Sequence, residues 1–200
     1  MEKAIRFLKK DPDLAKIISQ VGKYEIRIMK NPYKSLVEAI ITQQLSGKAA
    51  DSISKRFREL FVRFPKPKDV LEMPDSKLRK TGLSAMKISY IKDLSNRIEK
   101  REIKISSLRK MTDDEIVLHL TQVKGIGRWT AEMFLIFSLG RPDVLPVGDL
   151  GLKKGIQRLY SMSDLPKENE IERLAEKWRP YRTVATWYLW KSLKQFDKIG

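Results

Sequence analysis

The chain has no cysteine and one histidine, His119, among its 200 residues. The lack of cysteine excludes disulfides, thiol nucleophiles, zinc sites built on thiolates and iron–sulfur clusters held by cysteine. With one histidine, we expect neither a histidine-based metal site nor a serine-histidine-aspartate triad. Any chemistry must therefore use carboxylates, lysines, hydroxyls or the backbone.

The sequence also lacks an apolar run of about 18 residues, the length that indicates a membrane span. The first sixteen residues, MEKAIRFLKKDPDLAK, contain acids and lysines and no signal-peptide core. We therefore expect a cytoplasmic protein, associated with the nucleoid if the source is prokaryotic, and no membrane partner.

The chain is strongly basic, with a formal net charge of +16 and an isoelectric point near 9.9. A charge of this size favours a polyanionic partner such as nucleic acid. The alternative is a lysine-rich solvated surface of the kind found in heat-adapted proteins. A hydrophobic content of 42% and four tryptophans are typical of a globular protein with a substantial core.

The spacing of apolar residues predicts helices and no strand of useful length. Residues 35–44 read as a helix, and Ser46 is expected to cap the next one after a very short turn. In residues 84–98 we expect Met86, Tyr90 and Leu94 to form one apolar stripe. The sequence TDDE at 112–115 is a capping box that begins another helix. These features predict an all-α fold, and a chain of 200 residues can form either one substantial domain or two small helical lobes that flank a cleft.

The stretch KGIGRWTAEMFLIFSLG, residues 124–140, joins two predicted helices through a tight glycine hairpin. Such a hairpin can present several unpaired amides to one DNA phosphate with little regard to sequence. An ordinary turn between helices remains the alternative. The residues expected to bind DNA are Lys124, Gly125, Ile126, Gly127, Arg128 and Thr130.

Asp149 follows the loop RPDVLPVG and stands at the expected N-cap of the helix LGLKKGIQRLY. Spacing alone favours a structural cap, which is worth on the order of 1 kcal/mol. A catalytic role for this carboxylate is the alternative.

The run LTQVKGIGRWTAEMFLIFSLGRPDVLPVGDLGLKKGI resembles the helix-hairpin-helix DNA glycosylases. The form GIGRWTA, together with AIITQQLSGKAA and LRKTGLSAMKISYIKDL upstream, is similar to the alkylation-repair branch, 3-methyladenine DNA glycosylase II. The resemblance covers residues 35–190. It implies one glycosylase unit over residues 1–200, made of a central lobe of roughly 35–140 and a second lobe from the N-terminal helix and roughly 141–200.

The resemblance implies that Asp149 is the catalytic aspartate. It also implies that the hairpin binds a backbone phosphate. A monovalent cation, Na⁺ or K⁺, is expected to be held there by the backbone carbonyls of Val123, Gly125 and Gly127. Relatives that also cut the strand carry a lysine two residues after the second hairpin glycine, where this chain has Trp129. Hydrolysis by water without strand cleavage is therefore expected.

The resemblance further places Trp129 and Trp190 in an aromatic pocket that receives the flipped base, although helical aromatics are more often core residues. Met133 replaces a tyrosine that lines the pocket of some relatives, and Gly148 stands where some carry an acid. Leu45, or Gln44 in its place, corresponds to the residue that fills the gap left by the base.

These expectations combine into a monofunctional glycosylase that removes alkylated purines, such as 3-methyladenine, from double-stranded DNA as a monomer, with no iron–sulfur cluster. A carboxylate can stabilise the oxocarbenium-like transition state of such a reaction and orient water. Two alternatives are a bifunctional glycosylase/lyase for oxidised bases and a non-catalytic helix-hairpin-helix DNA-binding module.

Overall fold

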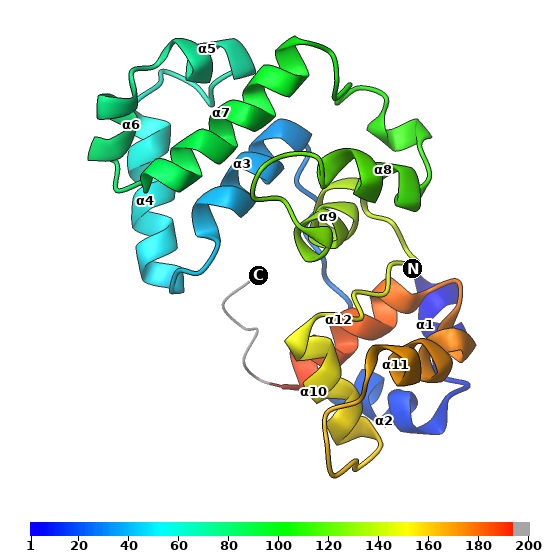
Figure 1. Ribbon diagram of the computed structural model, residues 1–200. Coiled ribbons are helices and arrows are strands. Elements are labelled where there is room, and N and C mark those ends of the chain that lie inside the picture. Colours follow the sequence, from blue (N-terminus) through cyan, green and yellow to red (C-terminus); the bar gives the residue numbers. More distant parts are fainter. Residues whose placement is uncertain (194–200) are drawn as a thin grey trace. The chain divides into compact units, whose positions relative to one another are not determined.

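All regular structure in the computed structural model, which describes residues 1–193, is helical (Figure 1). This confirms the all-α prediction. The first seven α-helices are α1 (Glu2–Leu8), α2 (Pro12–Val21), α3 (Pro32–Thr42), α4 (Gly47–Glu59), α5 (Pro67–Glu72), α6 (Asp75–Lys80) and α7 (Ala85–Glu99). The others are α8 (Asp113–Leu120), α9 (Arg128–Phe134), α10 (Leu150–Leu159), α11 (Glu168–Ala175) and α12 (Arg182–Ser192).

Three short helical segments complete the regular structure of the described residues. They are the 3-10 segments η1 (Leu108–Lys110) and η3 (Glu176–Trp178) and the π-helical segment η2 (Leu135–Leu139), which directly continues α9. None of the helices within residues 1–193 is long and apolar enough to cross a bilayer.

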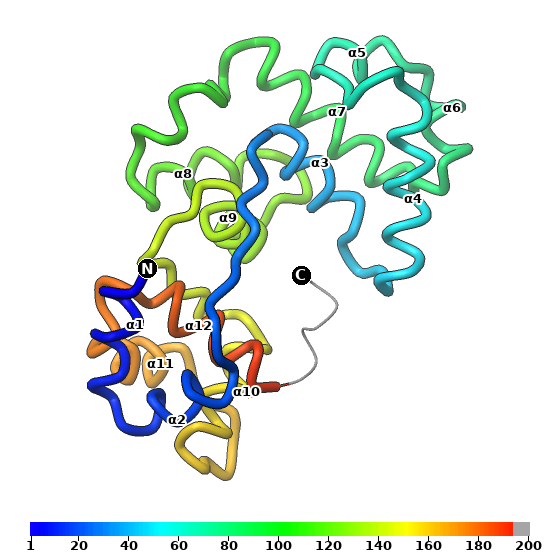
Figure 2. The backbone as a smooth tube through the Cα atoms, turned by 180° about the vertical axis from the view of Figure 1, so that it is seen from behind, coloured from blue at the N-terminus to red at the C-terminus, as the bar shows by residue number. Residues whose placement is uncertain are grey.

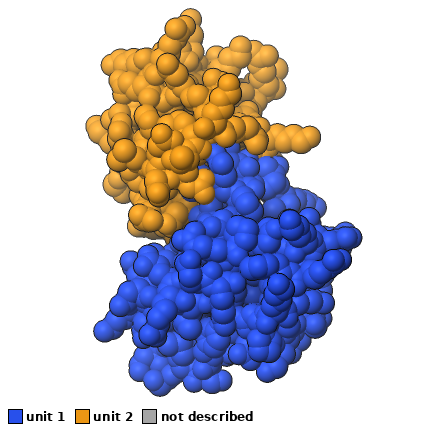
Figure 3. All heavy atoms as spheres, turned by 90° about the vertical axis from the view of Figure 1, so that its right-hand side faces the viewer, with its two compact units in different colours: residues 1–28, 135–200 blue, residues 29–134 orange. Residues whose placement is uncertain are grey.

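The chain divides into two compact units, drawn in two colours in Figure 3. Within the described residues, unit 1 comprises residues 1–28 and 135–193, so it combines two segments that are far apart in sequence. Within it, α1 and α2 pack against α12 (Figure 2). Unit 2 comprises residues 29–134 and contains the helices α3 to α9.

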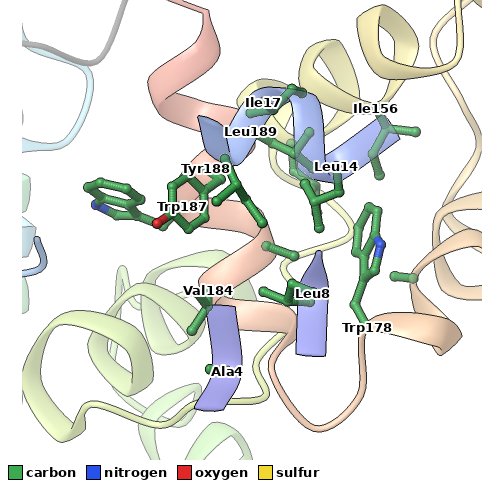
Figure 4. Close-up of a cluster of buried hydrophobic side chains, with 14 of the residues drawn as sticks. Ala4, Leu8, Leu14, Ile17, Ile156, Trp178, Val184, Trp187, Tyr188 and Leu189 are labelled. Atoms are coloured by element: carbon green, nitrogen blue, oxygen red, sulfur yellow. The ribbon is translucent and has the colours of Figure 1, made fainter. Parts of the chain in front are cut away.

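The core of unit 1 is built from apolar side chains that are far apart in sequence. Figure 4 shows Leu8 and Leu14 beside Trp178, with Ile156 and Leu189 from two further helices. Trp178 is fully buried, and burying an aromatic side chain removes a large apolar area from water. This core holds α10 and α12 against each other.

Asp11 is a buried carboxylate inside this unit and the N-cap of α2. It accepts hydrogen bonds from the indole of Trp178 and the ammonium of Lys177, both at 2.9 Å. Burial alone raises the pKa of Asp11, but the hydrogen bonds from Trp178 and Lys177 outweigh it, so the pKa lies below its ordinary value. Asp11 therefore stabilises the unit mainly in its ionised form.

In unit 2, the long helix α7 packs against α3, α5 and α6. Its buried stripe consists of Ile88, Ile91 and Leu94. The expected stripe of Met86, Tyr90 and Leu94 is wrong at its first position, because Met86 is 58% exposed. The apolar stripe is set by the neighbouring helices, and the two β-branched isoleucines rather than Met86 face them.

The helix boundaries follow the capping chemistry that the sequence indicates. Thr112 and Glu115 form the expected capping box at the start of α8. Gly140 ends the apolar segment with a φ of 68°. Ser46 lies at the N-cap of α4, but its side chain makes no capping hydrogen bond there, which differs from the expected role.

Candidate functional site

The hairpin between α8 and α9, residues 123–127, contains two glycines that are there for different reasons. Gly125 has a φ of +79°, and a Cβ at this position would lie 2.0 Å from the ring of Tyr90. Gly125 is therefore required by the fold. A Cβ at Gly127 would meet nothing within 4 Å, and its φ is not positive. Nothing inside the described chain requires glycine at position 127.

Several backbone amides around this hairpin are available to a ligand. Within residues 1–193, the amides of Gly125, Gly127, Arg128 and Thr130 donate no hydrogen bond. Free amides at a turn that begins a helix form an arrangement that binds anions. The Lys124 amide is engaged, because it donates to Asp93 Oδ2 at 2.9 Å.

The side chains predicted to bind DNA fall into two groups. Lys124 and Arg128 are exposed, and Arg128 donates to the buried carboxylate of Glu132 at 2.9 Å. Ile126 and Thr130 are buried, so their side chains anchor the hairpin in unit 2 rather than face a ligand. Of these two residues, only Thr130 has an amide that is available to a ligand, because the Ile126 amide donates to the Val123 carbonyl.

Trp129 and Met133 lie one helical turn apart on α9. Trp129 is 48% exposed, an unusual state for such a large apolar side chain, while Met133 is half-buried. The turn that was expected to hold the wedge residue consists of Gln44, Leu45 and Ser46. Leu45 is exposed there, and Gln44 adopts a φ of 56°. All of these residues belong to unit 2.

Asp149 lies in unit 1 as the N-cap of α10, as the sequence predicts. It is almost fully buried, and its Oδ1 accepts two hydrogen bonds: one from the Leu152 amide at 2.6 Å and one from Trp190 Nε1 at 2.7 Å. The helix N-terminus is favourable for a negative charge, and the two donors fix the direction of the carboxylate.

Trp190 is buried and its ring stacks on Phe137 with the centroids 5.9 Å apart and an interplanar angle of 16°. The family resemblance places Trp190 in the pocket, but nothing in the sequence indicates its contact with Asp149. The two residues are 41 positions apart, so no local pattern relates them.

The loop before Asp149 is held by residues that no local sequence pattern singles out. Asp143 accepts two hydrogen bonds at 2.8 Å from the guanidinium of Arg182, one on each oxygen. Thr183 accepts from the Val144 amide at 2.9 Å and donates to the Arg141 carbonyl at 2.7 Å. In the sequence, only the place of Asp143 within a proline-rich loop and of Arg182 at a helix start indicates this pairing. The start of α12 thereby fixes the loop that carries Asp149.

The position of Gly148 faces an acidic side chain from α11. A Cβ at Gly148 would lie 3.9 Å from Glu168 Oε1, and Lys153 Nζ lies 4.0 Å from the same oxygen. Lys153 is thus partly paired with Glu168.

The carbonyls that the resemblance assigns to a cation already accept hydrogen bonds. Val123 O accepts from the Ile126 amide at 3.1 Å, and Gly125 O accepts from Gln43 Nε2 at 2.8 Å. Each carbonyl oxygen has a second lone pair, so both retain the capacity to act as ligands of a monovalent cation. Within residues 1–193, no three acidic, histidine or cysteine side chains are grouped as a metal site requires.

A family model described as the HhH-GPD superfamily base excision DNA repair protein matches residues 37–180. The match includes the hairpin, the loop and Asp149. The chain belongs to this superfamily.

Curated relatives and solved structures agree with the membership. The DNA-3-methyladenine glycosylase 1 of Schizosaccharomyces pombe is 37% identical over 199 residues, which cover 94% of this chain and 85% of the relative. The structure of the 3-methyladenine DNA glycosylase of that yeast in complex with abasic DNA has a TM-score of 0.87 at 35% identity and covers 96% of this chain and 97% of its own. A DNA-3-methyladenine glycosidase from Bacillus halodurans has a TM-score of 0.86 at 38% identity, with 95% and 88% of the two chains covered.

Proposed function

We propose that this HhH-GPD protein is a monofunctional DNA glycosylase. It hydrolyses the N-glycosidic bond of alkylated purines, such as 3-methyladenine, in base excision repair. The observation that carries the proposal is the buried carboxylate of Asp149, oriented by the Trp190 indole and the start of α10. The similarity to DNA-3-methyladenine glycosylases over most of the chain supports the alkylated substrate.

The carboxylate of Asp149 suits this reaction for an electrostatic reason. Departure of the base leaves positive charge on the sugar, and a fixed carboxylate stabilises this oxocarbenium-like transition state. The same carboxylate orients the water that attacks the anomeric carbon. An alkylated purine carries a positive charge before it leaves, so its departure needs little help from a general acid.

Double-stranded DNA is the proposed partner, bound by a monomer. The four amides around Gly125 and Gly127 hold a backbone phosphate, and the open space at Gly127 allows the phosphate to approach closely. The net charge of +16 strengthens this attraction and makes it dependent on salt. A cation at the hairpin would add positive charge beside the phosphate through the carbonyls of Val123 and Gly125.

The damaged base must leave the stack before it reacts. We propose that Leu45, or Gln44 in its place, fills the gap, and that the exposed indole of Trp129 and the side chain of Met133 contact the extruded base. An electron-poor alkylated base gains roughly 1–2 kcal/mol from stacking on a desolvated indole. The partial exposure of Trp129 is the observation that supports this role.

The two other functions differ from this one in a measurable way. A bifunctional glycosylase/lyase needs an amine nucleophile, and Trp129 stands where the resemblance would put the lysine. A non-catalytic DNA-binding module would use Asp149 only as a cap.

The deciding experiment measures release of free base from methylated duplex DNA by the native chain and by Asp149→Asn. The product is treated with and without alkali. We expect base release by the native chain, strand breaks only after alkali, and a rate on the order of 100-fold lower for Asp149→Asn. DNA binding without base release from any alkylated duplex would refute the enzyme and favour the binding module.

A further inference from the structure

We call the turn of Gln44, Leu45 and Ser46 the wedge turn. Three side chains on one face of α7 contact either the hairpin or the segment just before the wedge turn. Lys87, Tyr90 and Asp93 follow one another at intervals of three residues, which places them on the same face of the helix. Tyr90 packs directly under Gly125, and Asp93 accepts the Lys124 amide at 2.9 Å. The hairpin therefore rests on α7.

Lys87 holds the end of α3, one residue before the wedge turn. Its ammonium donates to the carbonyls of Ile41 and Gln43, both at 2.7 Å. The last carbonyls of a helix have no partner inside the helix, and here a lysine from another helix takes that place. Burial lowers the pKa of Lys87 from its usual value. The Lys87 ammonium is thus partly desolvated at the place where it binds the carbonyls next to the wedge turn.

Gln43 connects the wedge turn to the hairpin. Its backbone carbonyl accepts from Lys87, and its side-chain Nε2 donates to Gly125 O at 2.8 Å. The two contacting segments are 82 residues apart in sequence. One residue is thus bonded both to the helix that supports the hairpin and to the hairpin itself.

We propose that Gln43 and Lys87 are positioning residues that hold the wedge turn at a fixed place relative to the phosphate-binding hairpin, so that capture of a phosphate directs base extrusion. This proposal rests on the proposed glycosylase function, because it assigns the wedge turn a role in that reaction. It assigns these two residues a positioning role through their contacts with other residues, not through contact with the sugar or the base.

The test compares Gln43→Met, which keeps the length of the side chain and removes its donor, with Gln20→Met on an exposed face of α2. Each protein acts in single turnover on two methylated duplexes. One has the lesion in a normal pair and the other has it opposite an abasic site, where extrusion is easier. We expect Gln43→Met to be roughly tenfold slower on the paired lesion and within about twofold of native on the other.

Equal slowing of Gln43→Met on both duplexes would overturn the proposal, because it would indicate damage to the chemistry or the fold. No slowing on the paired lesion would overturn it as well. A thermal melt of each variant accompanies the rates. Lys87→Met is expected to show the same selective loss, with Lys80→Met as the control that removes the same charge from an exposed site.

A second readout does not depend on base release. We place 2-aminopurine beside a non-hydrolysable abasic analogue and measure the fluorescence rise that reports local unstacking. Gln43→Met is expected to give less than half of the native rise at saturating protein. If the native chain gives the rise but releases no base from any duplex, the glycosylase function fails while this readout still judges the role of Gln43. An unchanged rise in Gln43→Met would overturn the role.

Discussion

Trp190 donates its indole N–H to Asp149 Oδ1 at 2.7 Å, and the same oxygen accepts the Leu152 amide at 2.6 Å. The proposed catalytic carboxylate is thus fixed by one bond from its own helix and one from α12. The second bond connects this carboxylate to the core of unit 1, in which α12 packs on α2 and α10.

We predict that Trp190→Phe separates the packing of this side chain from its hydrogen bond to Asp149. Phenylalanine keeps a ring against Phe137 but has no N–H for Asp149. The single-turnover rate of base release should fall roughly tenfold while DNA affinity stays unchanged, since one orienting hydrogen bond is lost. The free energy of unfolding should fall by about 1 kcal/mol.

Trp187→Phe is the matched control for this experiment, because Trp187 lies on the same helix, is equally buried and contacts Tyr24 instead. Its base-release rate should match the native value. A similar loss of rate in both variants would contradict a specific role for the Trp190 indole.

We predict that the two hairpin glycines respond in opposite ways to alanine. Gly127→Ala should leave the melting temperature unchanged, because its Cβ enters open space, yet weaken binding to undamaged duplex by about tenfold, because the phosphate can no longer approach. Gly125→Ala should lower the free energy of unfolding by about 2–4 kcal/mol, because it combines a positive φ with a clash against Tyr90. Equal affinities of native protein and Gly127→Ala, measured by fluorescence anisotropy, would show that no phosphate contacts this glycine.

We predict that borohydride traps no covalent complex between the native chain and methylated DNA. A trapped complex requires a Schiff base from a lysine, and Trp129 stands at the position where the strand-cutting relatives carry it. The gel assay includes a known bifunctional glycosylase with its own substrate as the positive control. A trapped band from this chain would instead support the lyase alternative.

We predict that Asp11 makes the stability of unit 1 dependent on acid. Because its pKa is lower in the folded chain than in the unfolded one, its contribution is fully present above the ordinary carboxyl pKa of about 4. That contribution is lost as the pH falls through the folded-state pKa. Urea unfolding between neutral and acidic pH should show this loss in the native chain and not in Asp11→Asn.

At neutral pH, Asp11→Asn should lower the free energy of unfolding by about 2–3 kcal/mol, because charge-assisted bonds from Trp178 and Lys177 are weakened. Asp13→Asn, on the exposed side of the same first turn, should change it by less than about 0.5 kcal/mol. A loss of equal size in both variants would contradict the special role of Asp11.

The sequence by itself determined the features that depend on neighbours along the chain. The capping box at Thr112, the N-cap at Asp149 and the hairpin at Gly125 follow from side chains and φ preferences within a few residues. The basic charge and the absence of cysteine also follow directly from the sequence. The charge favours a polyanionic ligand, and the absence of cysteine excludes thiol chemistry.

Only the tertiary structure decided which distant side chains meet. Trp190 reaches Asp149, Gln43 reaches Gly125 and Lys87 reaches the end of α3 because packed helices bring them together, and helical periodicity does not encode such pairs. The error at Met86 has the same cause, since an apolar side chain is buried only where a neighbouring helix covers it. Local sequence specified where each helix begins and which groups it offers, and helix packing specified which of those groups act together.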